Sequence, residues 1–408
     1  MADSESETAT QKFKLNPAAV IFGEATAKQR EIISTMGGSP QPPLTPEEYL
    51  MSQKTLSRPG TKVYEDIRYF CLFHKDETEM LISACEVHHR QAVVSDTSGA
   101  SPDVITVNAY AIASVYTPPQ FRGQGMASFM LQRLQELVDQ GGYEVGVLYS
   151  AIGGDFYGRL GWAAFDRREL VISLDVGQPE DDDDAVHLLS ETEMPPLCER
   201  DCQLLSSKLE ILAKAHDQNE PSHTVRHVSL LPTYEQMAFH MLRDTYMAEV
   251  LYTCRGLPRP DMYHGAITRD KRSWLYWDHG LPSPAYNVKL RILRIVTDPG
   301  DEAEKMVRDV ELLLKAAVGE AARSGLEKVV VWEPDEVTVT AAMGVWDKEK
   351  DTADGQGQGN SKRVITNVVV EDRKDDDWSL PCLRWRGDDG GNKGRLTVWV
   401  DNQAFGWC

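Results

Sequence analysis

Residues 104–116 alternate between apolar and polar side chains, and this period of two predicts a strand with one buried face. The apolar positions are Ile105, Val107, Ala109, Ala111, Ala113 and Val115. After Gly125 the apolar residues recur mostly at intervals of three and four, which predicts a helix closed by Gly141-Gly142. A second strand is predicted at Glu144–Ser150, so this segment forms a β–loop–α–β unit.

Further elements are predicted on both sides of this unit. One helix spans residues 24–36, and another starts at Thr45-Pro46-Glu47-Glu48, a capping box with proline at the first helical position. The first half of the chain is completed by strands at 62–73, 79–88, 162–165 and 169–174 and by a short helix at 156–160.

The second half of the chain repeats this order of elements after an acidic segment. Residues 177–184 (GQPEDDDD) predict a solvated linker, because no EF-hand glycine or terminal glutamate follows at the spacing of a calcium loop. A connecting helix is predicted at 199–216. The repeated unit then consists of a strand at 288–292, a helix capped by Asp301 and Glu304, and a strand at 329–332.

The chain end carries weaker signals, and together they set the predicted domain boundaries. Residues 351–363 (DTADGQGQGNSKR) predict an exposed loop, and residues 383–385 and 396–400 predict a strand pair. We expect a first domain at 1–175, an acidic linker with a connecting helix at 176–217, and a second domain at 218–408.

Length and composition agree with two soluble domains. The chain has 408 residues and a mass of 45.7 kDa, which is too large for one ordinary domain. No apolar run reaches the roughly 18–20 residues of a membrane span, and the polar, acidic start at 1–11 does not resemble a secretory signal. Seven scattered cysteines suggest reduced thiols, so we expect a cytoplasmic protein.

The charge of the chain narrows the choice of partners. The formal net charge is −20 at pH 7. Such a field repels nucleic acids and anionic membranes, so we expect neither as a partner, and it favours a cationic substrate.

The segment 115–127 (VYTPPQFRGQGMA) carries the strongest chemical signal, because it joins the buried strand to the amphipathic helix. Glycines let backbone N–H groups face outward, and the helix N-terminus adds a positive dipole end, so the loop is suited to a pyrophosphate. Pro118 and Pro119 remove donors at the end of the strand and splay it from its neighbour. A dinucleotide fingerprint is the weaker interpretation, because Ser128 stands at its third glycine position.

Together with Leu148-Tyr149-Ser150 and Phe156-Tyr157-Gly158-Arg159-Leu160-Gly161-Trp162, this loop resembles the GNAT N-acetyltransferase superfamily over residues 12–175. The resemblance implies an α/β (α+β) fold with a GNAT-type mixed, splayed sheet flanked by helices. It also implies acetyl-CoA as co-substrate. The pyrophosphate would be bound by Gln120, Arg122, Gly123, Gln124, Gly125, Met126 and Ala127.

The resemblance assigns further roles to single positions. Backbone groups of Val115 and Thr117 would hold the pantetheine arm. Tyr157 would be the general acid for the departing thiolate, and a ring that only packs in the core is the alternative. Ser150 stands where many members have an asparagine that contacts the pantetheine arm, so this contact is weakened here. No metal is implied.

An acceptor amine also needs to lose a proton. With a pKa of about 10.4, only on the order of one alkyl amine in 2,500 is neutral at pH 7, so a base accelerates the reaction. We expect Glu86 as this base, and a structural contact with Arg90 or a backbone amide is an equal alternative. Tyr110 touches the substrate or, more simply, packs against the sheet. We interpret His88 and His89 as surface or edge-strand residues.

The remaining constellations are weaker. Cys198 and Cys202 have no partner pair for a metal. Trp277, with Trp274, Tyr276 and His279, either lines a pocket for a cationic substrate or belongs to an aromatic core strand. The second β–α–β unit has acidic residues at 297–302 in place of a phosphate loop, so we expect a degenerate GNAT-like domain. The apolar end, 404–408, packs or frays, or else brings its carboxylate to the site as a base.

Within the superfamily, the segments 83–86 (SACE), 115–123 and 148–153 are similar to the fungal L-lysine N6-acetyltransferases of lysine catabolism. This resemblance implies direct attack of the ε-amine of L-lysine on acetyl-CoA, without an acyl-enzyme. A broad-specificity amine or protein-lysine acetyltransferase of the Eis type is one alternative. A non-catalytic acetyl-CoA-binding regulator is the other. The oligomeric state is not predicted.

Overall fold

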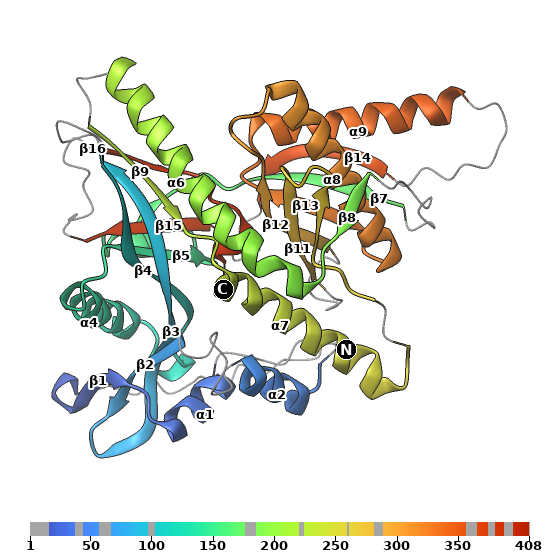
Figure 1. The fold of residues 1–408 in the computed structure, drawn as a ribbon. Helices are drawn as coiled ribbons and strands as arrows, with labels where there is room; N and C mark the ends of the chain where they lie inside the picture. Colours follow the sequence, from blue (N-terminus) through green and yellow to red (C-terminus); the bar gives the residue numbers. More distant parts are fainter. Residues whose placement is uncertain are drawn as a thin grey trace, which may run out of the picture.

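The computed structural model describes residues 16–36, 44–56, 67–96, 103–175, 185–219, 224–258, 261–280, 289–355, 365–373, 380–386 and 395–407. Within these residues the strands form two sheets, one of nine strands and one of seven, with helices against both (Figure 1). This mixed α/β architecture confirms the predicted fold class. No helix in the described part of the chain is long and apolar enough to cross a bilayer.

The nine-stranded sheet has the order β1-β2-β3-β4-β5-β15-β6. In addition, β9 pairs with residues 92–96 of β3, and β16 pairs with β9. The pair β4–β5 is parallel, and the pairs on either side of it are antiparallel. The bounds are β1 Val20–Glu24, β2 Ile67–His74, β3 Glu77–Asp96, β4 Asp103–Tyr116, β5 Val145–Ser150, β6 Ala163–Ala164, β9 Thr224–Leu230, β15 Leu380–Trp385 and β16 Arg395–Trp399.

Helices cover both faces of this sheet. On one face, α4 (Met126–Gln140) packs its apolar stripe, including Met130 and Leu134, against β2–β5. On the other face lie α1 (Ala27–Met36) and α7 (Tyr234–Leu251), and α2 (Pro46–Leu56) contacts α7. The one-turn helix α5 (Asp155–Gly158) follows β5. Single 3₁₀ turns occur at Pro17–Ala19, Pro119–Phe121, Glu191–Glu193, Thr253–Arg255 and Ala404–Gly406.

The seven-stranded sheet has the order β14-β7-β13-β12-β11-β10-β8. Its parallel pair, β12–β13, is joined by α8 (Ala303–Arg323), which confirms the second β–α–β unit. Helix α9 (Glu336–Gly355) packs beside α8. The strands are β7 Arg168–Leu174, β8 Val186–Leu188, β10 Gly265–Thr268, β11 Trp274–Gly280, β12 Lys289–Val296, β13 Lys328–Trp332 and β14 Ile365–Asp372.

A central core joins the two sheets. It contains apolar residues of β4, β5 and β9, of α7, of β11 and β12, and of α6 (Met194–Asn219), the long helix that crosses the molecule in Figure 1. Phe405 near the chain end belongs to the same core. A buried ion-pair network reinforces it, because Arg294 of β12 binds both Asp201 of α6 (2.9 Å) and Asp401 (2.8 Å).

Strand partners across the two halves of the chain differ from the sequence expectation. The segment 169–174 becomes β7, but it pairs with β13 and β14 in the second sheet rather than with the first. The predicted strand pair at 383–385 and 396–400 is wrong, because β15 pairs with β5 and β6 whereas β16 pairs with β9. Each sheet therefore contains strands from both halves of the sequence.

Several local expectations also need correction. The helix predicted at 24–36 begins only at Ala27, after a capping box in which Thr26 and Gln29 exchange hydrogen bonds, and residues 20–24 form a strand that was not predicted. Residues 351–355 of the predicted loop continue α9. The remainder of that loop, the linker at 177–184 and Cys408 lie outside the described residues.

Candidate active site

The loop after β4 has the geometry that its glycines predict. Gly123 and Gly125 have φ angles of +73° and +76°, which residues with a Cβ adopt only with strain. Gly125 is the N-cap of α4, and no side chain caps this helix terminus. The first turn of α4 contains no acidic residue, so its amides and dipole face an open position suited to an anion.

Side chains of the same loop hold its shape. Arg122 donates from Nε to the carbonyl of Thr117 (2.8 Å), and its guanidinium lies over the ring of Tyr116. Gln124 donates to the carbonyl of Gln120 (3.4 Å). Arg122 and Gln124, assigned to pyrophosphate by resemblance, are therefore also internal supports of the loop. Met126 and Ala127 begin the helix.

Strands β4 and β5 separate where a thioester arm would enter. Their parallel ladder ends at Ile112 and Leu148, and β4 continues to Tyr116 without that partner. A β-bulge against β3 accompanies the separation, with Ser114 at a φ of +52°. The bulge changes the direction of the last residues of β4, and Val115 and Thr117 lie directly after it. The splay that the sequence attributed to two prolines thus starts before them.

Ser83 supports the end of β4 from the neighbouring strand. Its hydroxyl donates to the carbonyl of Tyr116 (3.1 Å) and lies 2.9 Å from the hydroxyl oxygen of Thr117. The sequence analysis includes Ser83 in the segment 83–86 but predicts no role for its side chain. The signal was weak, since a serine in an apolar strand indicates only that some polar partner is nearby.

Tyr157 lies on the α4 side of the sheet. Its ring is buried with Cys85 and Cys382 around it, and this burial raises the pKa of its phenol well above the usual value. The phenol is therefore protonated at neutral pH, as a general acid must be. The helix α5 that carries it is fixed by backbone bonds from Leu160 and Trp162 to the carbonyl of Tyr157.

Ser150 is buried at the end of β5, and its hydroxyl is engaged locally. It donates to the carbonyl of Gly153 (2.7 Å) and accepts from the amide of Ile152 (3.1 Å). These bonds close the turn between β5 and α5. The side chain thus shapes the entrance to α5, and one acceptor site of its oxygen remains for another group.

Glu86 lies on the opposite face of the sheet from Tyr157. Its carboxylate is 17% exposed and stands 3.5 Å from Nε2 of His88. His88 is buried against Phe239 of α7, with ring centroids 5.7 Å apart. The interpretation of His88 as an edge or surface residue is therefore wrong, because β3 is an interior strand. His89 is partly buried and hydrogen-bonded to Tyr143 (3.2 Å).

Both residues expected at the substrate are packed in cores. Tyr110 is 1% exposed, between Tyr143 and Trp162, with its hydroxyl 3.5 Å from Arg384. Trp277 is completely buried in the second sheet and donates to the carbonyl of Tyr263 (2.7 Å). A substrate has no access to either ring in this structure, so the packing alternative describes both.

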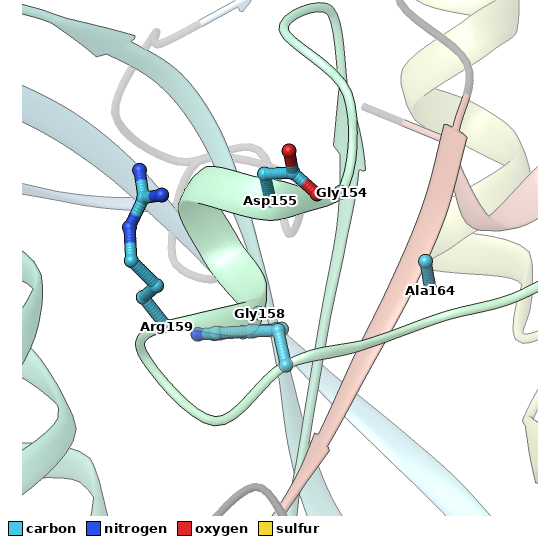
Figure 2. Close-up of a pocket in the computed structure, with 6 residues that line it drawn as sticks. Gly154, Asp155, Gly158, Arg159 and Ala164 are labelled. Atoms are coloured by element: carbon cyan, nitrogen blue, oxygen red, sulfur yellow. The ribbon is translucent and has the colours of Figure 1, made fainter.

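A shallow pocket of about 520 Å³ borders α5 (Figure 2). It is lined by Gly154, Asp155, Gly158, Arg159, Trp162 and Ala164. None of the residues expected to bind the cofactor lines it, although Arg159 and Trp162 belong to the same sequence signature as Tyr157.

The corresponding region of the second sheet is closed. The turn before α8 carries Asp298 and Asp301, both paired with Arg272, in place of an anion-binding loop. The pairing of β12 with β13 ends at Ile292, and beyond it the amide of Ile295 donates to the side chain of Gln403 (3.0 Å). Residues near the end of the chain therefore bind β12 just beyond the point where its pairing with β13 ends.

Comparison with family models defines the class of protein. An acetyltransferase (GNAT) domain model matches residues 75–165, which hold the loop, the splay and Tyr157. The fold and this match define a GNAT-type N-acetyltransferase with two GNAT-like domains, and domains of this type use acetyl-CoA. A model described as the LYC1 GNAT-like C-terminal domain matches residues 172–408, more than half of the chain, and the protein belongs to that family.

Solved structures with a similar arrangement are distant in sequence. A GCN5-related N-acetyltransferase from Kribbella flavida is 14% identical, with a TM-score of 0.44 and coverage of 90% of this chain and 72% of that one. Eis1 from Mycobacterium abscessus is 13% identical, with a TM-score of 0.42 and coverage of 90% and 73%. Among curated proteins, none matches the sequence.

Proposed function

We propose that the protein transfers the acetyl group of acetyl-CoA to the ε-amine of free L-lysine and so forms N6-acetyl-L-lysine, a step of lysine degradation. The observation that carries the proposal is the placement of Tyr157 and Glu86 on opposite faces of the sheet, beside the splay of β4 and β5. The resemblance of 83–86, 115–123 and 148–153 to fungal lysine acetyltransferases supports the choice of acceptor, as does membership in the family with the LYC1 GNAT-like domain.

In this proposal the two reactants approach the splay from opposite faces of the first sheet. Acetyl-CoA binds with its pyrophosphate at the N-terminus of α4 and its pantetheine arm in the splay. The ε-amine approaches from the Glu86 face, and Glu86 accepts its proton directly or through water. The neutral nitrogen attacks the thioester carbonyl, the C–S bond breaks as the C–N bond forms, and Tyr157 protonates the departing thiolate. The nitrogen releases its second proton to water as it becomes an amide, and the Tyr157 phenolate takes a proton back from water.

The covering of the acceptor face supports a small substrate. Phe239 of α7 packs against His88, two residues from Glu86. Helix α7 is itself held by α2, because Tyr246 donates to the carbonyl of Glu48 (2.6 Å). A face covered in this way favours a small free amino acid over a lysine on a folded protein as the acceptor. The net charge of −20 favours a cationic amine.

The test measures CoA thiol release with free L-lysine and identifies the product by mass spectrometry. We expect N6-acetyl-L-lysine, and a loss of about 10²–10⁴-fold in kcat for Tyr157→Phe, the range for a general acid. Tyr143→Phe is the matched control, because it removes a phenol of the same domain that bonds only His89 among the described residues. It should retain wild-type kcat.

Glu86 is tested by the pH dependence of the rate. In Glu86→Gln we expect a low rate at pH 7 that rises toward the amine pKa of about 10.4, because the variant relies on amine that is already neutral. Glu79→Gln, an exposed position of the same strand paired with Lys28, is the control. Thiol release only with polyamines, aminoglycosides or peptides would remove the lysine assignment. No release with any amine, despite acetyl-CoA binding, would contradict the proposed catalysis.

A further inference from the structure

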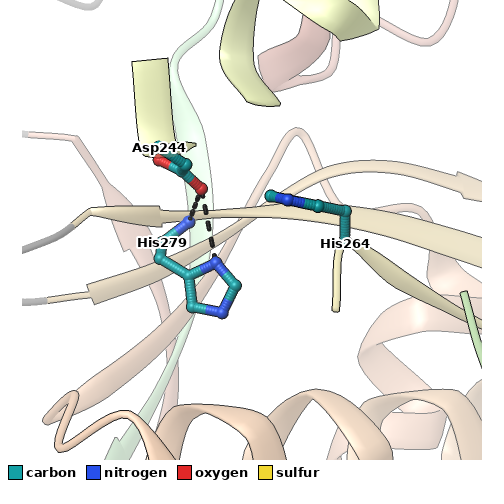
Figure 3. Close-up of side chains that lie close together, drawn as sticks. All are labelled: Asp244, His264 and His279. Atoms are coloured by element: carbon teal, nitrogen blue, oxygen red, sulfur yellow. Dashed lines mark hydrogen bonds and ion pairs between the residues drawn. The ribbon is translucent and has the colours of Figure 1, made fainter. Parts of the chain in front are cut away.

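Three side chains that the acetyl transfer does not use converge in the second half of the chain. They are Asp244 of α7, His264 immediately before β10, and His279 of β11 (Figure 3). One ligand atom from each lies within 4.8 Å of the other two, and all three residues are buried. An oxygen and two imidazole nitrogens in one small space form a donor set typical of a divalent transition metal.

His264 has a ring nitrogen without a protein partner. The residue is 5% exposed, and its Nδ1 is buried and makes no hydrogen bond within the described residues. Most buried polar atoms in folded proteins have a partner, and this nitrogen is free to accept one beside the other two side chains of the cluster. Figure 3 shows the ring turned toward Asp244 and His279.

His279 is oriented by carboxylates on both sides. Its Nδ1 is 3.3 Å from Oδ2 of Asp244, and its Nε2 is 2.7 Å from Oε1 of Glu320 in α8. Arg323 in turn binds Glu320 (2.8 Å). A histidine that ligates a metal through one nitrogen commonly donates its other N–H to a carboxylate, which fixes the ring. Glu320 occupies this outer position.

We propose that Asp244, His264 and His279 form a zinc site, with Glu320 as the outer carboxylate that orients His279. The ion would connect α7 to β10 and β11 in the second half of the chain. Because α7 also places Phe239 against His88, the metal would stabilise the helix that covers the acceptor face, without taking part in the transfer. The metal-free alternative is an ion-pair cluster in which a charged His279 is shared between the two carboxylates.

The test uses the full chain, stripped with a chelator and titrated with ZnCl2 or CoCl2. We expect one metal per chain by elemental analysis, a Co²⁺ absorption spectrum of a tetrahedral site, and a rise in Tm that saturates at one equivalent. No stoichiometric metal, no Co²⁺ spectrum and no Tm change would overturn the proposal and leave the ion-pair cluster.

Variants locate the ion. His264→Asn should lose metal, and Glu320→Gln, which leaves the three ligands in place, should weaken affinity about 10–100-fold. His227→Asn is the control, since His227 is a buried histidine bonded to Ser95 outside the cluster. If His264→Asn folds and binds zinc as the wild type does, the metal lies elsewhere and the proposal is wrong. Metal binding is measured without any acceptor amine, so it does not depend on whether L-lysine is the substrate. The zinc site and the proposed function can therefore be refuted independently.

Discussion

Gly125→Ala tests the loop that we propose to bind the pyrophosphate, and Gly142→Ala offers a matched control at the other end of the same helix. Both glycines have a left-handed backbone, with φ of +76° and +79°. An added Cβ meets nothing within 4 Å at either position. The two substitutions therefore introduce the same backbone strain and no steric clash, but only Gly125 lies where the pyrophosphate would bind.

The expected magnitudes follow from this geometry. A non-glycine residue in the left-handed region costs about 1–2 kcal/mol, so both variants should lose a similar amount of folding free energy. Relief of the strain at Gly125 rotates the first amides of α4 away from the phosphate. Loss of one charge-assisted hydrogen bond is worth about 1.5–3 kcal/mol, which corresponds to about a 10–150-fold higher Kd for acetyl-CoA.

The assay combines isothermal titration calorimetry with acetyl-CoA and chemical denaturation of both variants. We expect equal losses of stability and a weaker Kd for Gly125→Ala alone. An unchanged Kd for Gly125→Ala, at the expected loss of stability, would refute the assignment of this loop to the pyrophosphate. An equal weakening in Gly142→Ala would show that the effect is global rather than local.

Two further substitutions test the packing and the electrostatics of the fold. At Gly146 a Cβ would stand 2.5 Å from the Tyr110 ring, so Gly146→Ala should cost about 1–3 kcal/mol by denaturation, whereas Gly23→Ala in β1, with 3.7 Å of space, should cost less than half of that. Burial alone would raise the pKa of Asp401, but Arg294 and Lys208 outweigh it and lower this pKa to about 2. Because the folded pKa lies below the unfolded one, Asp401 contributes about 2 kcal/mol at neutral pH, and this contribution falls between about pH 4 and pH 2. Asp401→Asn, which tolerates the local φ of +50°, should therefore be less stable than the wild type at pH 6 and similar to it near pH 2; a difference that does not change with pH would contradict the ion-pair account.

Local signals in the sequence were sufficient for the β–loop–α–β unit and its loop. Gly125 and the apolar spacing after it fix the start of α4, and the structure places that start at Met126. The alternation at 104–116 predicted the strand correctly, but it did not predict which of its residues are buried. Ile105 is 55% exposed, whereas Ala109–Ile112 are buried on both faces, since α4 covers one side and the central core covers the other.

The positions of the site residues depend on contacts that no local pattern records. Glu86 and His88 alternate with Cys85 and Val87 in an apolar strand, and their face is decided by α7, which lies about 150 residues later in the sequence. The bulge at Ser114 likewise arises from the register between β3 and β4. The cluster of Asp244, His264 and His279 has no recognisable spacing, because three separate elements supply it.

The exchange of strands explains why the second half of the chain matters to the first. Without β15, the strand β5 would present an unpaired edge along 145–150, directly before the turn at Ser150 and the helix that carries Tyr157. Arg384 of β15 also binds Asp139 near the end of α4 through two hydrogen bonds (2.8 and 2.6 Å). Residues 380–386 thus hold β5, the turn before Tyr157 and the end of α4 in register, although the motifs themselves lie within 115–162. The geometry of the GNAT motif in this protein consequently depends on a strand more than 200 residues later in the sequence.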